Sequence, residues 1–210
     1  MEQAKRLKVR AATLPNFKPS KLEVKPTASN TKVVDFHDDL IRACKNNDAT
    51  AQQQLYMKYR VAMFNTALRI LGKREDAQDA LQEAFVSAFR SIENYDGRAT
   101  FGAWLKRIVI NKSINLLRKR DRVRFESIEN KADEAAFQEQ DDIAYTSEQI
   151  NSAIMELPTA CRAVFTMKAL EGLTHQEIGH FLDISEGTSK SQFNRARKLL
   201  QEALLSLQSK

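Results

Sequence analysis

The sequence feature that most constrains the fold is an apolar stripe over residues 77–92 with the period of an α-helix. Its members recur at i, i+3, i+4, i+7 and onward: Ala77, Ala80, Leu81, Ala84, Phe85, Ala88, Phe89 and Ile92. Such spacing places all of them on one buried face of a helix. The opposite face begins with Asp76, Asp79, Gln82 and Glu83. An acidic face of this kind is either solvated or contacts a basic protein surface.

Helical periodicity continues on both sides of this stripe and predicts an all-α protein. Leu40, Ile41 and Cys44 indicate a short helix. A longer helix is expected to end at Gly72, because glycine is typical of C-terminal caps. Only 6 glycines and 4 prolines occur in the 210 residues, which argues against a β-sandwich or β-barrel.

A basic helix is expected over residues 101–124. One of its sides is polar and consists of Arg107, Asn111, Asn115 and Arg118. Arginine and asparagine suit both phosphates and base edges. Three aromatic residues, Tyr95, Phe101 and Trp104, cluster beside its start. Rings next to a basic strip can stack on unpaired bases, and the same rings also suit the core of a helical domain.

The C-terminal part of the chain has the pattern of a helix-turn-helix. After a helix with Pro158 in its first turn, a capping box from Thr174 to Glu177 opens a short helix, and Ser185 caps a long final one. The last helix is expected to expose Glu186, Thr188, Lys190, Ser191, Asn194, Arg195 and Lys198. In a helix-turn-helix this face reads base edges and holds phosphates. In an ordinary helical hairpin it is only solvated.

The distribution of charge divides the chain into four parts. The net charge is +6, but residues 103–125 carry eight basic side chains and one acidic, and residues 126–148 carry one basic and eight acidic. We expect a disordered basic tail over 1–36, a helical domain over 37–125, an acidic flexible linker over 126–148 and a helix-turn-helix domain over 149–210. A linker of this length spans at most about 75–80 Å, which would let the two small helical domains sit nearly two DNA turns apart.

Several classes of function are excluded by the sequence. No apolar run is long enough to span a bilayer and no secretory signal is visible, so we expect a cytoplasmic protein without membrane insertion. Cys44 and Cys161 fall on apolar faces and are expected to be buried thiols. Phosphate-binding, dinucleotide-binding and zinc-protease motifs are missing, and His175 and His180 are poorly spaced for a shared metal. We therefore expect no catalysis, no cofactor and no metal.

Three stretches of the chain resemble motifs of the bacterial extracytoplasmic-function (ECF) sigma factors, a group of the sigma-70 family. Residues 75–85 resemble the pattern D-A-E-D-L-V-Q-E-x-F, and residues 101–120 resemble F-x-A-W-L-x-R-I-x-x-N followed by L-R-x-R. Residues 157–158, 171–178, 184–188 and 195–197 resemble the C-terminal domain that reads the −35 element. The matches follow the order of the family and cover about 37–125 and 149–210.

The resemblance implies a sigma factor that binds core RNA polymerase, directs it to promoters and promotes their melting. Docking on the β′ clamp helices would involve Asp76, Asp79, Gln82, Glu83 and Phe85. Binding and melting of the −10 element would involve Tyr95, Phe101, Trp104, Lys106, Arg107, Asn111, Lys112, Asn115, Arg118, Lys119 and Arg120. Binding of the −35 duplex would involve Thr174, Ser185, Glu186, Thr188, Lys190, Ser191, Asn194, Arg195, Arg197 and Lys198. The β flap is a further implied partner, and an anti-sigma factor is left open.

The chain departs from the family pattern in the helix-turn-helix. Asp183 stands in the turn where glycine is usual, and aspartate tolerates left-handed backbone, so we expect the turn to persist. Ser189 and Gln192 replace a typical valine and arginine, which predicts altered phosphate contacts. In addition, Asn115 replaces a common aspartate and Gly179 a usual alanine.

Two other functions fit parts of the sequence. A dimeric helix-turn-helix regulator of duplex operator DNA explains the C-terminal part, but it leaves residues 76–85 and the basic helix unexplained. A helical adaptor that binds a protein through the acidic face predicts that Lys190 and Arg195 are dispensable.

Overall fold

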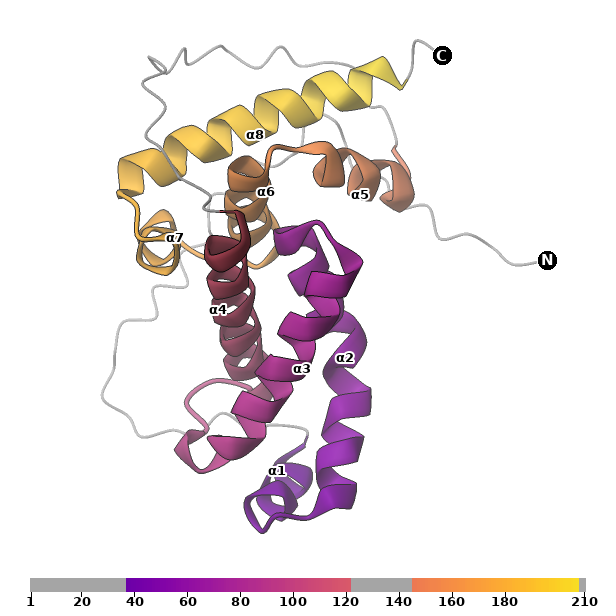
Figure 1. Ribbon diagram of the computed structural model, residues 1–210, viewed down its shortest axis with the longest axis vertical. Coiled ribbons are helices and arrows are strands. Elements are labelled where there is room, and N and C mark those ends of the chain that lie inside the picture. Colours follow the sequence, from indigo (N-terminus) through magenta and orange to yellow (C-terminus); the bar gives the residue numbers. More distant parts are fainter. Residues whose placement is uncertain (1–36, 122–144, 208–210) are drawn as a thin grey trace, which may run out of the picture.

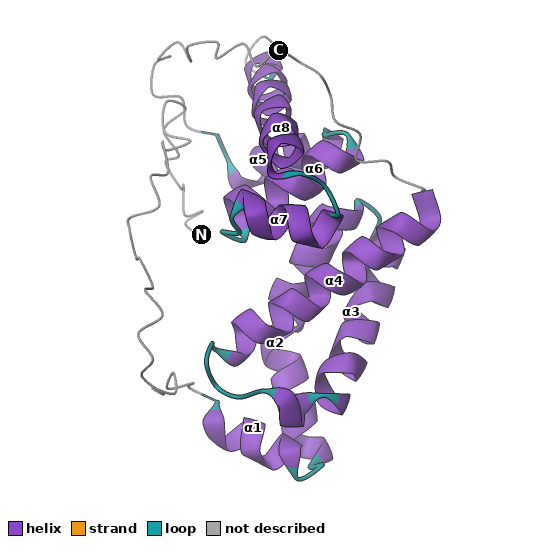
Figure 2. Ribbon diagram, turned by 90° about the vertical axis from the view of Figure 1, so that its left-hand side faces the viewer, coloured by secondary structure: helices purple, strands orange, loops and turns teal. Residues whose placement is uncertain are grey.

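Helices make up nearly all of the chain that this computed structural model describes, which is residues 37–121 and 145–207 (Figures 1 and 2). Within these two segments no strand occurs, and the prediction of an all-α fold with two helical domains is confirmed. The expected tail over 1–36 lies outside the described residues, and so does most of the expected linker.

The first helical unit consists of α1 (Asp38–Lys45), α2 (Ala49–Leu71), α3 (Arg74–Arg90), the 3₁₀ turn η2 (Ile92–Asn94) and α4 (Phe101–Asp121). Helices α2, α3 and α4 pack together, and α1 lies at their lower end (Figure 1). The predicted stripe on α3 is buried from Ala77 to Ala88, and its alanines let α3 pack closely against α2 and α4. Ile92, expected at the end of this helix, lies on η2 and is still buried.

Both ends of α2 are capped as local chemistry requires. The Asp48 carboxylate accepts hydrogen bonds from the backbone N–H groups of Thr50 and Ala51. At the other end Gly72 has φ 78°, in the left-handed region, and its N–H donates to the carbonyl of Leu68. The prediction that the helix ends at Gly72 is confirmed.

The second helical unit consists of α5 (Ser147–Glu156), α6 (Thr159–Phe165), the π-helical turn η3 (Thr166–Leu170), α7 (His175–Leu182) and α8 (Glu186–Ser206). Helix α8 crosses over α5, α6 and α7 (Figure 1). Buried residues such as Ile154, Phe165 and Leu200 form the core of this second unit. Pro158, expected in the first turn of α6, instead precedes it as the N-cap residue.

Helix α5 begins at Ser147, two residues before the expected start of the second domain at residue 149. The reason is a capping box. The Thr146 hydroxyl accepts from the N–H of Gln149, and the Gln149 side chain accepts from the N–H of Thr146. Tyr145, just before it, is buried.

The two units contact each other directly. Helix α2 packs against α6, and α4 packs against α7. Ile70 on α2 and Ile110 and Ile114 on α4 belong to the same buried cluster as Val164 and Met167 of the second unit. Figure 2 shows α7 lying next to α4. Sequence periodicity predicted the two helical domains but not this contact between them.

Candidate nucleic-acid and protein interfaces

The predicted polar side of α4 is present in the structure. Arg107, Asn111, Asn115 and Arg118 are all exposed, as is Lys119, and Lys106 and Lys112 are half-buried. Helix α4 is described only to Asp121, so residues 122–124 of the expected basic helix lie outside the described part, together with the side chain of Arg120. An exposed row of arginine and asparagine on one helix can bind phosphates and base edges.

Several cations of this row contact the second unit. The Nη2 atom of Arg107 lies 2.9 Å from a carboxylate oxygen of Glu177, and Lys106 Nζ lies 2.7 Å from one of Glu171. Arg118 donates to the carbonyl of Phe181 over 3.4 Å. No local pattern predicts that these cations have partners within the same chain.

The aromatic residues at the start of α4 form a packed group. Phe101 is fully buried and its ring centroid lies 5.4 to 5.8 Å from those of Tyr59, Tyr95 and Trp104. Tyr95 is also buried, and its hydroxyl donates to the carbonyl of Ala99. Phe101 and Tyr95, both predicted to contact DNA, therefore serve as core in this structure. Trp104 is half-buried and keeps part of its ring accessible.

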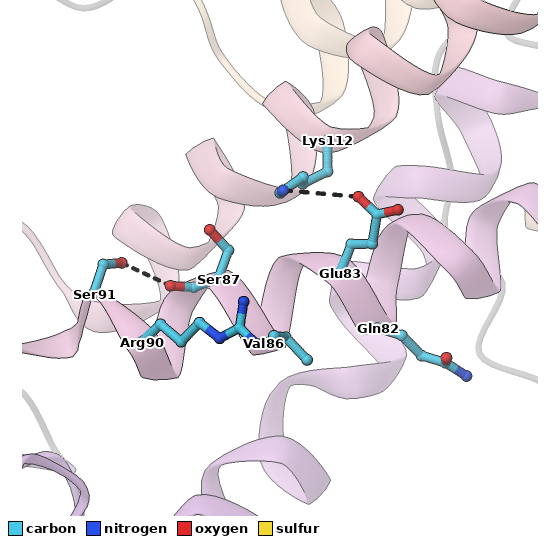
Figure 3. Close-up of a pocket in the computed structure, with 7 residues that line it drawn as sticks. All are labelled: Gln82, Glu83, Val86, Ser87, Arg90, Ser91 and Lys112. Atoms are coloured by element: carbon cyan, nitrogen blue, oxygen red, sulfur yellow. Dashed lines mark hydrogen bonds and ion pairs between the residues drawn. The ribbon is translucent and has the colours of Figure 1, made fainter.

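The acidic side of α3 is exposed at Asp79, Gln82 and Glu83, whereas Asp76 is half-buried. Phe85, expected to contact the polymerase, is only 3% exposed and packs edge-to-face against Tyr56, so in this structure it belongs to the core. A surface hollow between α3 and α4 is lined by Gln82, Glu83, Val86, Ser87, Arg90, Ser91 and Lys112 (Figure 3). Its apolar member, Val86, is 49% exposed, and Glu83 lies 3.7 Å from Lys112. The lining carries one acidic side chain, Glu83, and two basic ones, Arg90 and Lys112, around the accessible aliphatic side chain. Charges of both signs around an aliphatic side chain suit a protein partner better than a nucleic acid.

The helix-turn-helix is confirmed in its local geometry. In the capping box of α7 the Thr174 hydroxyl accepts from the N–H of Glu177, and the Glu177 carboxylate accepts from the N–H of Thr174. The Thr174 N–H and hydroxyl both donate to this carboxylate, and these hydrogen bonds, followed by the nearby Arg107, hold the pKa of Glu177 below its usual value. Asp183 has φ 56° and ends α7 in the left-handed conformation, as predicted. Ser185 caps α8 by accepting from the N–H of Thr188.

The outer face of α8 agrees with the prediction at most positions. Glu186, Lys190, Asn194, Arg195 and Lys198 are exposed, and Ser191 and Arg197 are half-buried. Ser185 and Thr174, the two caps, are also exposed. Thr188 was expected on this face, but it is only 7% exposed because its hydroxyl hydrogen-bonds to Ser185. Lys190 Nζ lies 2.6 Å from Glu186, which lowers the pKa of that carboxyl.

The two departures on α8 lie on its inner face. Ser189 is fully buried and hydrogen-bonds to His175 on α7, and Gln192 is 3% exposed and accepts from the thiol of Cys161. In this chain both positions therefore join α8 to its neighbours instead of facing a DNA phosphate. Partial burial, followed by the charges of Lys168 and Lys190, lowers the pKa of His175.

Cys44 and Cys161 are both buried free thiols, as predicted. Burial, with a smaller contribution from Asp48, raises the pKa of Cys44 to about 11. Within residues 37–121 and 145–207 no cluster of three or more histidine, cysteine or acidic residues could hold a metal ion. In the same described segments no helix is both long and apolar enough to cross a membrane.

Comparison with known proteins identifies both helical units. Residues 55–123 match the family pattern of sigma-70 region 2, and residues 147–200 match that of sigma-70 region 4. SigE, an ECF RNA polymerase sigma factor of Mycolicibacterium smegmatis, is 31% identical over 169 residues, which cover 75% of this chain and 65% of that protein. The RNA polymerase sigma-H factor of Pseudomonas aeruginosa is 30% identical over 178 residues, which cover 79% of this chain and 92% of that protein.

A further relative is also a sigma factor by name, and a solved structure is similar as well. SigM, an ECF RNA polymerase sigma factor of Mycobacterium tuberculosis, is 30% identical over 79% of this chain and 83% of its own length. Among solved structures, that of CnrH in complex with the cytosolic domain of CnrY is 26% identical, with a TM-score of 0.48, over 80% of this chain and 96% of that one. The order of the two matched regions, their helical structure and these relatives together show that the chain belongs to the ECF RNA polymerase sigma factors, a family of transcription initiation factors.

Proposed function

We propose that this protein binds core RNA polymerase, directs it to specific promoters through their −10 and −35 elements, and promotes promoter melting. The observation that carries the proposal is that two surfaces suited to DNA, on α4 and α8, occur in one chain together with an acidic protein-binding surface on α3. Catalysis would belong to the core polymerase. We expect the protein in the bacterial cytoplasm, because polymerase and promoter DNA are there.

The proposed polymerase contact is the outer side of α3. Asp79, Gln82 and Glu83 are exposed on this side. Gln82 and Glu83 also line the hollow between α3 and α4, together with Val86 (Figure 3). By resemblance, the partner is the pair of clamp helices of the β′ subunit. Acidic groups around an aliphatic centre would meet basic and apolar groups of that partner, which favours both encounter and packing. Phe85 supports this surface from beneath as part of the core.

The proposed −10 contact is the polar side of α4 and the loop before it. Single-stranded DNA would follow the exposed Arg107, Asn111, Asn115 and Arg118, which neutralise phosphates and bond to base edges. Trp104, whose ring is partly accessible, is the side chain most suited to stack on a base. The buried Tyr95 and Phe101 would hold that indole and the 95–100 loop in position.

The proposed −35 contact is the outer face of α8. Its exposed Lys190, Asn194 and Arg195 occupy the first three turns, which is the part of a recognition helix that enters the major groove, and Lys198 follows in the fourth turn. Glu186, now paired with Lys190, can accept from a cytosine amino group. The β flap is expected to hold this unit on the polymerase, and an anti-sigma factor is a further expected partner.

In-vitro transcription tests the proposal. Purified core RNA polymerase would transcribe a library of genomic fragments with and without this protein. We expect discrete new start sites that share two upstream elements about two helical turns apart. Absence of both new starts and binding to core polymerase would overturn the proposal and favour a duplex-operator regulator.

A pair of variants separates promoter recognition from general charge. Lys190→Ala with Arg195→Ala removes two exposed cations from α8 and should weaken the new starts strongly. Arg42→Ala with Lys58→Ala removes two exposed cations of the first unit away from the proposed DNA surfaces and should leave them unchanged. Equal loss in both pairs would contradict a −35 role for α8.

A further inference from the structure

The last turn of α1 holds a lysine whose side chain reaches the loop before α4. Lys45 Nζ donates to the carbonyl oxygen of Tyr95 over 3.0 Å, although the two residues are 50 positions apart in the sequence. Lys45 is half-buried, which shields this hydrogen bond from water. A hydrogen bond from a charged donor is also stronger than one between neutral groups. The contact therefore connects α1 with the start of the 95–100 loop.

The backbone of Lys45 is held in place by the core and by the end of its helix. Ile41 and Cys44, on the inner side of α1, are 4% and 1% exposed. The backbone N–H groups of residues 46–48 donate to carbonyls of the last turn of α1. A helix end whose carbonyls have such partners is well defined. The Lys45 side chain thus extends from a fixed part of the molecule.

The loop that Lys45 contacts is closed by its own hydrogen bonds. The Tyr95 ring is buried, and its hydroxyl donates to the carbonyl of Ala99 over 2.7 Å. The Asp96 carboxylate accepts from the N–H of Arg98 over 3.0 Å, and Gly97 between them has φ 75°. Because Tyr95 is bound through its carbonyl, its ring and its hydroxyl, the position of the whole loop depends on this residue.

The exposed side of the loop lies next to Trp104. Residues 96 and 98–100 are exposed, and the ring centroids of Tyr95 and Trp104 are 5.5 Å apart. The loop and Trp104 both belong to the −10 surface proposed above. A DNA base that binds at this surface would therefore contact groups that Tyr95 holds in place.

We propose that Lys45 is a positioning residue for promoter recognition. By binding the Tyr95 carbonyl, it holds the 95–100 loop in the conformation that distinguishes between bases of the −10 element. Lys45 does not itself contact DNA, because its ammonium group is directed to the protein backbone. Helix α1, which carries none of the proposed DNA-binding residues, thus contributes to the choice of promoter. This inference rests on the proposed −10 role of α4 and its loop.

A positioning lysine and a DNA-binding lysine differ in their measurable effects. A lysine that neutralises a DNA phosphate contributes to affinity for every sequence, and its removal lowers the slope of log affinity against log salt by about one. A lysine that positions a loop leaves this slope unchanged. Its removal lowers the preference for the correct base, because a loop that is less well ordered accommodates wrong bases as well.

The test uses three variants of the full-length protein, each combined with core RNA polymerase. Lys45→Met removes the donor and its charge, whereas Lys45→Arg keeps both. The control Lys58→Met removes the same charge from an exposed position on α2. Each holoenzyme initiates on a promoter found in the transcription experiment above and on derivatives with single base changes in the −10 or the −35 element. Base preference is the ratio of the initiation rates on the original and the changed promoter, and titration of the fluorescein-labelled promoter at several salt concentrations gives the slope.

We expect Lys45→Met to lower the preference for the original −10 bases about three- to tenfold, with the −35 preference and the salt slope unchanged. Lys45→Arg and Lys58→Met should behave like the wild type, and circular dichroism should show the same helix content in all variants. Full −10 preference in Lys45→Met, or a salt slope lowered by about one, would overturn the inference. If the wild type still prefers the original −10 bases in that case, only the inference fails. If the wild type initiates at no discrete promoter, the proposed function fails as well.

Discussion

At the scale of single residues, Arg162 and Gly72 depend on each other. A guanidinium keeps its charge at any physiological pH, so its burial is tolerated only where acceptors replace water. The carbonyls of Arg69, Met155 and Leu157 supply such acceptors at 3.0 to 3.1 Å. Gly72 makes room for this group and also ends α2 at φ 78°, so glycine satisfies two requirements at one position.

The two buried thiols lead to a prediction about reactivity. Burial raises the pKa of both Cys44 and Cys161, in the case of Cys44 to about 11, so at pH 8 only about one Cys44 thiol in a thousand is ionised. We expect iodoacetamide to leave both thiols of the native protein unmodified over an hour. In urea, where the chain is unfolded, we expect both thiols to be modified within the same time. Mass spectrometry measures the extent of modification in each case. Rapid modification of Cys161 in the folded protein would contradict its placement against Gln192.

At the scale of the elements, the turn between α7 and α8 depends on one unusual backbone conformation. Asp183 has φ 56°, which aspartate adopts at a modest cost and glycine at almost none. We expect Asp183→Gly to leave the free energy of unfolding unchanged or slightly higher, and Asp183→Val to lower it by about 1–2 kcal/mol. Urea denaturation followed by circular dichroism measures both, and equal effects of the two substitutions would contradict the left-handed turn.

The contact between α7 and α8 should also depend on pH. The pKa of His175 is lowered by partial burial and by Lys168 and Lys190, against an opposing effect of Glu186. When the pKa of a histidine is lower in the folded chain than in the unfolded chain, the neutral form favours folding. This contribution to stability is fully present at a pH above the unfolded pKa, near 6.5, and it is lost as the pH falls through the folded pKa. We expect the melting temperature to decrease from pH 7 toward pH 5, and to decrease less in His175→Gln. An identical pH profile in the variant would contradict the assignment to His175.

Some features of the elements could be predicted from the sequence and others could not. The stripe of α3, the caps at Gly72, Thr174 and Ser185, and the turn at Asp183 are local features, so periodicity and capping chemistry predicted them. The capping box of α5 has a local signal as well, and Thr146-x-x-Gln149 could have been found. By contrast, the burial of Arg162 and of Glu171 depends on residues about one hundred positions away, and no local pattern encodes such a contact.

The same distinction applies to the candidate sites. Exposure of the polar row on α4 and of most of the outer face of α8 followed from helical period alone. Phe85, Phe101 and Thr188 were expected to contact a partner, yet they are buried. Family motifs preserve core and contact residues alike, so a motif alone does not distinguish the two roles. The structure separates them by exposure.

At the scale of the whole molecule, the three proposed surfaces lie on different helices, so a substitution on one surface should not affect binding by the other two. The acidic face is on α3, the −10 face on α4 and the −35 face on α8, and Figure 1 shows α3 in the lower body with α8 across the top. Substitutions at exposed residues more than about 10 Å apart usually act additively. A variant of one surface should therefore leave the other activities in place.

Asp79→Lys and the pair Lys190→Ala, Arg195→Ala test this independence. Reversal of an exposed charge on α3 places like charges against a basic partner, so we expect core-polymerase affinity to fall about tenfold or more while DNA binding by α8 is retained. The α8 pair should keep core affinity and weaken duplex binding, and the slope of log affinity against log salt should fall by about one for each phosphate contact removed. Fluorescence titrations with core polymerase and with promoter duplex measure both affinities for each of the two variants. If Asp79→Lys leaves polymerase affinity unchanged, the α3 surface is only solvated, and the polymerase must bind elsewhere on the molecule.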